Sequence, residues 1–231
     1  MPAPSEISRA PASEEYFRAY KVERGVQREN RGIIDIEEHY TRGDFRFSFR
    51  NHLQAVSERF PGNGHIHVFD SGCGDGVAMG EIRALAPYIG REIRTTGITL
   101  RDASMHGTTL EERKHTDRLI VGSLQEAYAA GELEPDSVHF LLDFAGPLTF
   151  DHSDPENYFM QGSSVIPIYS ELLISGGTAV VSLSSFTGIE STNLQELRDA
   201  NLKTRYLLER YGLEIVRRSN SDIGYLLLEK K

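Results

Sequence analysis

The sequence predicts an α/β fold built on a seven-stranded, mostly parallel sheet that ends in an antiparallel hairpin. From His65 onward, short apolar runs rich in Val, Ile and Phe alternate with helix-like segments. This alternation is typical of parallel strands that are joined by crossover helices. The last two apolar runs are separated only by the short polar turn NSD, which is too short for a crossover and therefore predicts a hairpin.

We expect seven strands and five helices along this part of the chain. The strands are expected at residues 65–70, 93–99, 118–121, 137–143, 177–183, 213–218 and 223–229. The helices are expected at residues 77–89, 102–115, 123–131, 163–174 and 193–211. The fourth helix shows the helical period clearly, because its apolar residues share one face: Val165, Ile168, Tyr169, Leu172 and Leu173. Gly176 and Gly177 follow and predict its end.

The N-terminal part of the chain carries a different pattern. Its opening MPAPSEISRAPAS predicts a flexible tail over residues 1–13, and residues 14–43 predict a helical cap. Because the sheet is complete without this cap, we expect the cap, with Tyr20 and Tyr40, to act as a lid over the ligand site. We also expect the domain to fold without residues 1–43.

The charge pattern argues against a nucleic-acid partner. The formal net charge is −9, whereas affinity for a phosphate backbone comes from clustered Lys and Arg. One mixed basic segment, residues 44–52, places Arg46 and Arg50 four residues apart. On a helix this spacing favours a solvated stripe over a phosphate site. A small molecule is therefore the expected partner.

The composition is that of one domain without a membrane span. A chain of 231 residues with 39% hydrophobic composition can bury one sizeable core, so we expect residues 14–231 to form a single domain. The sequence contains no run of 18 apolar residues and no leader pattern. A single cysteine, Cys73, excludes an intramolecular disulfide and fits a reducing cytoplasm. The oligomeric state stays open.

A glycine-rich stretch, HVFDSGCGDGVAMGEI, follows the first strand at residues 67–82. Gly72, Gly74 and Gly76 allow the backbone to bend sharply and to approach a ligand without Cβ contacts. The start of the next helix favours a polar or anionic group, and Asp70 adds a carboxylate at the strand end. A dinucleotide fingerprint needs a third glycine where Val77 stands, so a nicotinamide site is disfavoured.

The run Asp70-Ser-Gly72-Cys-Gly74-Asp-Gly76 resembles the first motif of class I S-adenosylmethionine-dependent methyltransferases. The order of strands, crossover helices and terminal hairpin is similar to this Rossmann-like family as well. The resemblance implies that S-adenosylmethionine is the cofactor, that the acid contacts its methionine end, and that the three glycines pass beneath it. Cys73 lies in the same turn, where a small filler is the expected role, because no His or Lys beside it in sequence lowers its pKa.

The second strand departs from the family pattern at its end. Most members have an Asp or Glu there that binds both ribose hydroxyls, whereas this chain has Thr99 followed by Leu100. Thr99 can accept one hydrogen bond, and Asp102 offers an alternative carboxylate three residues later. The G-x-T-L run is similar to that of cyclopropane fatty acid synthases, which use the same cofactor.

Three further residues complete the expected cofactor site. After the third strand, Ser123 stands where many members bind the adenine amino group, and Leu124 stands where a backbone N–H faces the ring. Ser123 equally fits a helix cap. After the fourth strand, Asp143 is expected to border the transferred methyl group.

The sequence says less about the residues that would bind the methyl acceptor. The loop after Asp143 lacks the Asn-Pro-Pro-aromatic pattern of methyltransferases that act on planar amide or adenine amino nitrogens. The resemblance to the family therefore disfavours these acceptors. Four aromatic residues fit either an apolar pocket or the core: Phe144, Phe150, Tyr158 and Phe159. A general base is optional, and the candidates are Asp143, His106, His152 and Tyr40. We interpret His65 and His67 as strand histidines.

The sequence therefore favours a methyltransferase that acts on a small molecule by in-line transfer. One alternative is a non-catalytic S-adenosylmethionine-binding or interaction protein on the same fold, since the ribose acid is missing. A cyclopropane-synthase-like enzyme is a second alternative, and an oxidoreductase ranks last.

Overall fold

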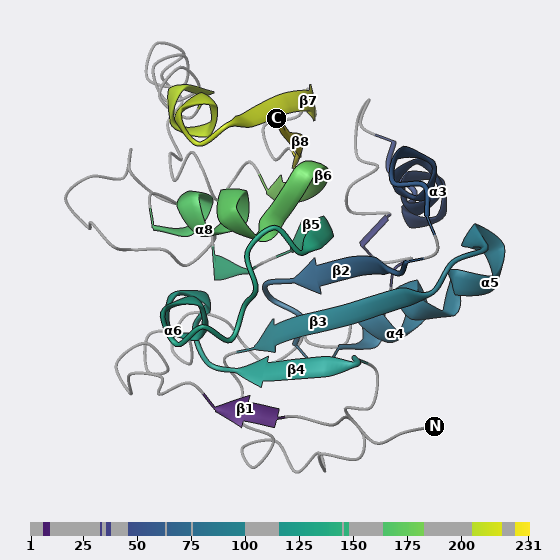
Figure 1. The fold of residues 1–231 in the computed structure, drawn as a ribbon, viewed down its shortest axis with the longest axis horizontal. Coiled ribbons are helices and arrows are strands. Elements are labelled where there is room, and N and C mark those ends of the chain that lie inside the picture. Colours follow the sequence, from purple (N-terminus) through teal and green to yellow (C-terminus); the bar gives the residue numbers. More distant parts are fainter. Residues whose placement is uncertain are drawn as a thin grey trace.

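The computed structural model describes residues 7–9, 33, 36–37, 46–62, 64–74, 76–99, 116–144, 146–147, 164–182, 205–218 and 225–231. These residues form one sheet with helices on both faces (Figure 1). Its strands are β1 (Ile7–Arg9), β2 (Ile66–Asp70), β3 (Ile93–Thr99), β4 (Arg118–Val121), β5 (Val138–Asp143), β6 (Leu173–Ser182), β7 (Leu213–Arg218) and β8 (Tyr225–Lys230). The helices are α3 (Phe49–Arg59), α4 (Val77–Ala84), α5 (Ala86–Ile89), α6 (Leu124–Ala129) and α8 (Val165–Leu172).

The strand order in the sheet is β1-β4-β3-β2-β5-β6-β8-β7. Strands β1 to β6 pair in parallel, while β8 pairs antiparallel with both β6 and β7. The predicted mostly parallel sheet and its C-terminal hairpin are confirmed. The chain first proceeds from β2 outward to β4 and then returns to β5 on the other side of β2. The order therefore reverses between β2 and β5, and ligands bind at such a switch point in open α/β sheets.

One strand was not predicted. β1 pairs with β4, with Ile7 beside Leu119 and Arg9 beside Val121. It lies within the residues 1–13 that the sequence assigns to a flexible tail, so the sheet holds the seven expected strands and one short edge strand. Three residues are too few to show a period in the sequence, and a neighbouring strand edge supplies their hydrogen bonds.

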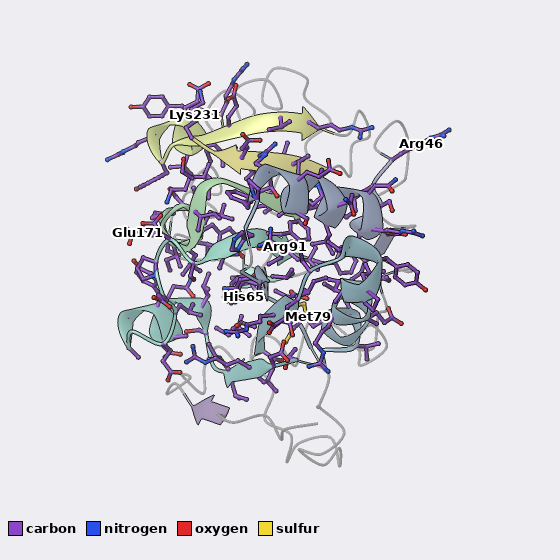
Figure 2. The ribbon with its side chains drawn as sticks, turned by 45° about the vertical axis from the view of Figure 1, so that its right-hand side comes forward. Arg46, His65, Met79, Arg91, Glu171 and Lys231 are labelled. Carbon is purple, nitrogen blue, oxygen red and sulfur yellow. The ribbon has the colours of Figure 1, made fainter. Side chains whose placement is uncertain are left out.

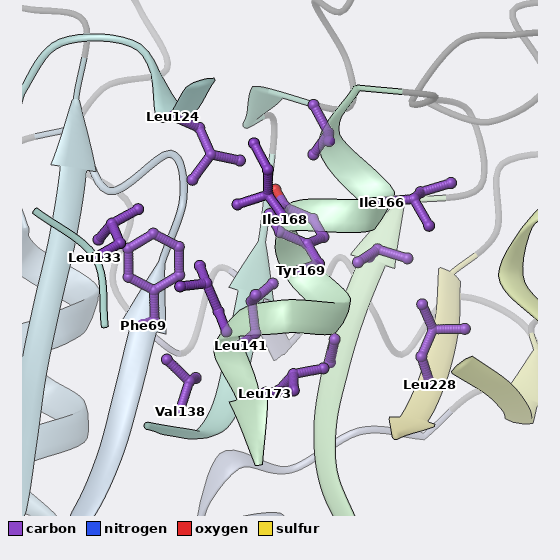
Figure 3. Packing of buried hydrophobic residues seen from close by; sticks show 14 of the residues in the cluster. Phe69, Leu124, Leu133, Val138, Leu141, Ile166, Ile168, Tyr169, Leu173 and Leu228 are labelled. Atoms are coloured by element: carbon purple, nitrogen blue, oxygen red, sulfur yellow. The ribbon is translucent and has the colours of Figure 1, made fainter. Parts of the chain in front are cut away.

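Two hydrophobic clusters hold the helices against the two faces of the sheet. On one face α6, α8 and the first residue of β7, Leu213, pack against sheet residues such as Phe69, Leu141 and Ala179. Figure 3 shows Phe69, Leu133 and Leu141 beside Tyr169 of α8 in this cluster. On the other face α3, α4 and α5 cover a second buried set, and burial of both faces explains the continuous apolar runs of the central strands.

The boundaries of two predicted helices are corrected. The helix expected over residues 77–89 is divided into α4 and α5 with Leu85 between them, and Pro87 falls in the first turn of α5. Proline has no backbone N–H, so it cannot continue the hydrogen bonding of α4. Likewise α8 ends at Leu172 because β6 begins at once, and the register between β5 and β6 shifts where Gly176 and Gly177 occur.

The stripe predicted for the basic segment is wrong in part. Arg46 precedes α3, whose N-cap is Ser48, and Arg46 extends away from the ribbon in Figure 2. Arg50 lies in the first turn of α3, where its guanidinium carbon is 4.9 Å from the centre of the Tyr88 ring. The two arginines are both exposed but do not share one helix face.

The cap contributes to the core. Of residues 14–43 the structure describes only Ile33, Ile36 and Glu37. Ile36 is 3% exposed and belongs to the cluster on the α3–α5 face, and Ile33 packs against that cluster. The backbone N–H of Ile33 also donates to Glu81 of α4 at 2.5 Å. That the domain folds without residues 1–43 stays a prediction, although their removal would expose this apolar surface.

Within the described ranges, none of the helices combines the length and the apolar character that a bilayer span needs.

Candidate functional site

The glycine turn, residues 71–76, lies at the carboxyl end of β2 and crosses toward both neighbouring strands. The backbone N–H of Ser71 donates to the Leu142 carbonyl at 3.0 Å, and the N–H of Cys73 donates to the Ile98 carbonyl at 3.0 Å. The N–H of Gly76 then closes the turn on the Cys73 carbonyl at 2.8 Å. The turn is thus fixed over the ends of β3 and β5, at the switch point.

Two of the glycines take backbone conformations that other residues rarely adopt. Gly74 has φ 55° and Gly76 has φ 78°, both in the left-handed region. Gly76 is the N-cap of α4, and no side chain caps this helix. The first N–H groups of a helix have no acceptor within it, so this end of α4 favours an anionic or polar ligand group.

Cys73 is a packing residue. It is 9% exposed and lies over Gly97 of β3, where an added Cβ would be 2.5 Å from the Cys73 sulfur and 2.9 Å from its Cβ. Only glycine at position 97 leaves room for this side chain. The small-filler interpretation of Cys73 is therefore confirmed.

Asp70 is a buried carboxylate beside the turn. It is 3% exposed, and its Oδ1 accepts the Gly72 N–H at 2.9 Å. Burial raises the pKa of Asp70 to about 7, the nearby charge of Asp143 adds to this rise, and the Gly72 N–H opposes it. A cationic ligand group beside Asp70 would favour its ionised form.

Asp143 ends β5 on the other side of the switch point and is fully buried, with 0% exposed surface. Its Oδ1 accepts the Gly146 N–H at 2.8 Å, and its Oδ2 accepts the phenol O–H of Tyr169 at 2.6 Å. Because both oxygens have protein donors, this geometry favours an anchoring role over the base role that the sequence left open.

In the sequence, Tyr169 stands out only as a member of the apolar face of its helix. The structure buries it to 1% exposure, with its phenol oxygen 2.6 Å from the hydroxyl oxygen of Ser71 as well as from Asp143. Burial, followed by the charge of Asp143, raises the pKa of Tyr169 well above its ordinary value, so the phenol keeps its proton. A buried tyrosine needs a polar partner, and this requirement was the available sequence signal.

The residues that were expected to contact the adenosine part of the cofactor are Thr99, Ser123 and Leu124. Thr99 ends β3 as expected and is 5% exposed, and its backbone carbonyl accepts the Gly122 N–H at 2.9 Å. Ser123 caps α6: its hydroxyl oxygen accepts the Glu126 N–H at 3.2 Å and its O–H donates to the Glu126 carboxylate at 2.6 Å. The cap interpretation of Ser123 is thus confirmed, while the side chain of Leu124 is buried in the core at 1% exposure.

Several expected residues lie outside the described ranges. They are Tyr20, Tyr40, Leu100, Asp102, His106, Phe150, His152, Tyr158 and Phe159, and the helix expected over residues 102–115 lies outside these ranges as well. Of the four aromatic residues considered for a pocket, Phe144 is described, and it packs against the core cluster on the α3–α5 face.

Of the two predicted strand histidines, His67 lies in β2 and has structural contacts, whereas His65 directly precedes the strand. The Nδ1 of His67 lies 3.1 Å from the Ser137 carbonyl and its Nε2 lies 2.9 Å from the Thr96 hydroxyl. Among the residues that the structure describes, no group of three or more His, Cys, Asp or Glu side chains is placed to hold a metal ion.

Comparisons with known proteins bear on the fold. No protein-family model and no curated protein sequence matches this chain. Among solved structures, the CMeT domain of the citrinin polyketide synthase aligns with a TM-score of 0.51 at 14% identity, over 78% of this chain and 50% of that chain. This chain thus spans half the length of that domain.

Two further solved structures are methyltransferases. Geranyl diphosphate methyltransferase, in complex with GPP and sinefungin, aligns with a TM-score of 0.48 at 12% identity, over 81% of this chain and 80% of that chain. The antibiotic-resistance methyltransferase Kmr aligns with a TM-score of 0.47 at 18% identity, over 79% of this chain and 93% of that chain. Identities this low speak to the fold alone, and the alignment with the CMeT domain, together with the strand order of the sheet, supports a Rossmann-like fold for this chain.

Proposed function

We propose that this protein binds S-adenosylmethionine at the carboxyl edge of its sheet and transfers the methyl group to a small-molecule acceptor. The observation that carries the proposal is the pairing of the glycine turn with the buried Asp70 at the switch point. The turn offers close backbone approach, and the carboxylate offers a counter-charge. Together they fit the amino acid end of this cofactor.

The described residues fit the cofactor as follows. Asp70 would hold the ammonium group, while Gly74 and Gly76 leave space for the methionine part above the turn. The uncapped N-terminus of α4 would face the carboxylate group. Thr99, at the end of β3, would accept one hydrogen bond from the ribose. The hydroxyl of Ser123 is already engaged in the cap of α6, so we assign the adenine contact to the backbone near Leu124.

When bound, the cofactor supplies a sulfonium methyl group that is already activated for displacement. The protein therefore contributes alignment and the exclusion of water. The chain contributes to this alignment through the hydrogen bonds that fix the glycine turn on β3 and β5. A general base is needed only where the acceptor loses its proton during transfer. Since the carboxylate of Asp143 is buried and hydrogen-bonded, we do not assign this base to Asp143.

Isothermal titration tests the proposal directly. The full-length chain is titrated in parallel with S-adenosylmethionine, S-adenosylhomocysteine and NAD. Binding of the first two ligands without binding of NAD supports the proposal. Binding of NAD alone would favour an oxidoreductase, and the absence of all three signals would refute a cofactor site in this turn.

A non-catalytic role on the same fold is the second candidate. It is favoured by Thr99 in place of the ribose acid and by Ser123 acting as a helix cap. A binding protein would retain S-adenosylmethionine without turnover in the presence of diverse hydroxyl, amine, thiol and carbon acceptors. A transferase would release S-adenosylhomocysteine with at least one acceptor class, and mass spectrometry of that product separates the two.

A further inference from the structure

A buried hydrogen-bond network joins three elements behind the proposed cofactor site. Tyr169 of α8 donates to the Asp143 carboxylate at the end of β5, over 2.6 Å. The same phenol oxygen lies 2.6 Å from the hydroxyl oxygen of Ser71, the first residue of the glycine turn. All three side chains belong to residues that are at most 3% exposed. The phenol therefore connects α8, β5 and the turn in a region without solvent.

Ser71 is held in place by neighbouring contacts. Its hydroxyl oxygen lies 3.2 Å from the Leu142 carbonyl oxygen, and its backbone N–H donates to the same carbonyl at 3.0 Å. The next residue, Gly72, donates its N–H to Asp70. A displacement of Ser71 would therefore move the donor that faces the Asp70 carboxylate.

The network leaves no spare room. A Cβ added to Gly146 would lie 2.6 Å from Asp143 Oδ1 and 2.9 Å from the Ser71 hydroxyl oxygen. The Gly146 N–H also donates to Asp143 at 2.8 Å. The chain after β5 thus closes tightly over the same pair that Tyr169 bonds, so the positions of Ser71 and Asp143 are coupled.

We propose that Tyr169 is a positioning residue for the cofactor turn: its phenol, through Ser71 and Asp143, fixes the turn in the conformation that binds the methionine end. This inference rests on the proposed function and deepens it. The ring of Tyr169 packs in the apolar cluster beside Leu141 (Figure 3), and that part of its role is served equally by phenylalanine. The hydroxyl alone carries the positioning role.

The first experiment compares two matched tyrosine variants by titration with S-adenosylhomocysteine. Tyr169→Phe removes the phenol hydroxyl and keeps the ring. Tyr128→Phe is the control, because Tyr128 also donates to a carboxylate of α8, that of Glu171, but does so in an exposed hydrogen bond away from the glycine turn. We expect Tyr169→Phe to weaken binding by about tenfold, the loss of roughly one charge-assisted hydrogen bond, and Tyr128→Phe to leave it unchanged.

A double-variant cycle separates positioning from general destabilisation. Ser71→Ala removes the hydroxyl through which Tyr169 is proposed to act. If Tyr169 acts through Ser71, the double variant binds S-adenosylhomocysteine no more weakly than the weaker single variant. Affinities are measured at a temperature where circular dichroism shows each variant to be fully folded, because a purely structural role would lower the melting temperature and leave the affinity of the folded protein intact.

The outcomes are distinct. An unchanged affinity of folded Tyr169→Phe, or additive losses in the double variant, would overturn the inference while the proposed function stands. A parent protein that binds no S-adenosylhomocysteine would overturn the proposed function and with it this inference. If Tyr169→Phe does not fold, Ser71→Ala alone decides, since positioning requires it to lose affinity as well.

Discussion

Asp70 and Asp143 end the adjacent parallel strands β2 and β5, one on each side of the point where the strand order reverses. Asp70 pairs in register with Leu142, the residue before Asp143, so the two carboxylates lie at the same edge of the sheet. They are 3% and 0% exposed. Asp143 is satisfied by the Gly146 N–H and the Tyr169 phenol, whereas Asp70 has a pKa raised to about 7. This edge of the sheet therefore holds one carboxylate, Asp143, that protein hydrogen bonds fix in place. The ionised form of the other, Asp70, would be stabilised by a cationic ligand group.

The raised pKa of Asp70 predicts a pH-dependent affinity. A ligand ammonium group favours the carboxylate form, so binding releases a proton wherever Asp70 is protonated in the free protein. With a free-state pKa of about 7, affinity for S-adenosylhomocysteine is expected to increase as pH rises from about 5.5 toward 7 and to level off above it. Titration calorimetry in buffers of different ionisation enthalpy measures both the affinity and the proton release.

Asp70→Asn is the control for this pH profile. It retains the size of the side chain and an oxygen acceptor for the Gly72 N–H but cannot ionise. The variant is expected to bind more weakly at neutral pH and to show a flat profile below it. A parent profile that is already flat would contradict the assignment of the ammonium group to Asp70.

Substitution of Gly74 is expected to abolish ligand binding. Gly74 has φ 55°, where a β-branched side chain is strained, and an added side chain would hinder the close backbone approach proposed for the ligand. Gly74→Val is compared with Gly90→Val, since Gly90 has φ 74° and nothing within 4 Å of an added Cβ. Both variants carry similar backbone strain, so loss of S-adenosylhomocysteine binding in the first alone locates the ligand. Equal binding by both would place it elsewhere.

Thr99→Asp is expected to tighten S-adenosylhomocysteine binding. Thr99 ends β3 and offers one neutral hydroxyl, whereas a carboxylate can accept both ribose hydroxyls. Charge-assisted hydrogen bonds contribute about 1.5–3 kcal/mol against about 0.5–1.5 for neutral ones, so the gain can reach roughly tenfold. Thr99→Val, which removes the hydroxyl at similar size, is expected to bind more weakly than the parent. Weaker binding by the Asp variant would indicate that another acid already occupies the ribose side.

Gly97→Ala is expected to destabilise the protein through Cys73. The new Cβ would lie 2.5 Å from the Cys73 sulfur and 2.9 Å from its Cβ, and overpacking of this kind costs about 1–3 kcal/mol of unfolding free energy. Urea denaturation measures the loss. Adding Cys73→Ala removes the closer contact and keeps the second, so the double variant should recover part of the stability. No recovery would mean that the strain lies in β3 itself.

Removal of residues 1–43 is expected to lower stability. Ile36 is 3% exposed within the core cluster of the α3–α5 face, so the truncated protein would expose apolar surface there. Thermal denaturation of the truncated chain is compared with that of Ile36→Ala, which is expected to lose about 2–5 kcal/mol. A truncated protein as stable as the parent would show that residues 1–43 contribute nothing to the stability of the core.

Much of the fold was determined locally along the chain. Strands β3, β4 and β7 occur at the predicted residues 93–99, 118–121 and 213–218. Their apolar runs are bounded by turn residues, and the short connection between β7 and β8 allows only a hairpin. The glycine turn was also predictable from local sequence. The positive φ angles at Gly74 and Gly76 favour glycine, and this preference does not depend on distant parts of the chain.

Only the tertiary structure decided how distant residues are paired. Tyr169 and Ser71 are separated by 98 positions, and a helical period shows that Tyr169 is buried but not which polar groups meet its hydroxyl. The packing of Cys73 on Gly97 and the pairing of β1 with β4 are of the same kind. Periodicity reports which face of an element is apolar. The partner across that face is set by how the elements pack together, and burial then requires each polar atom there to find a hydrogen bond.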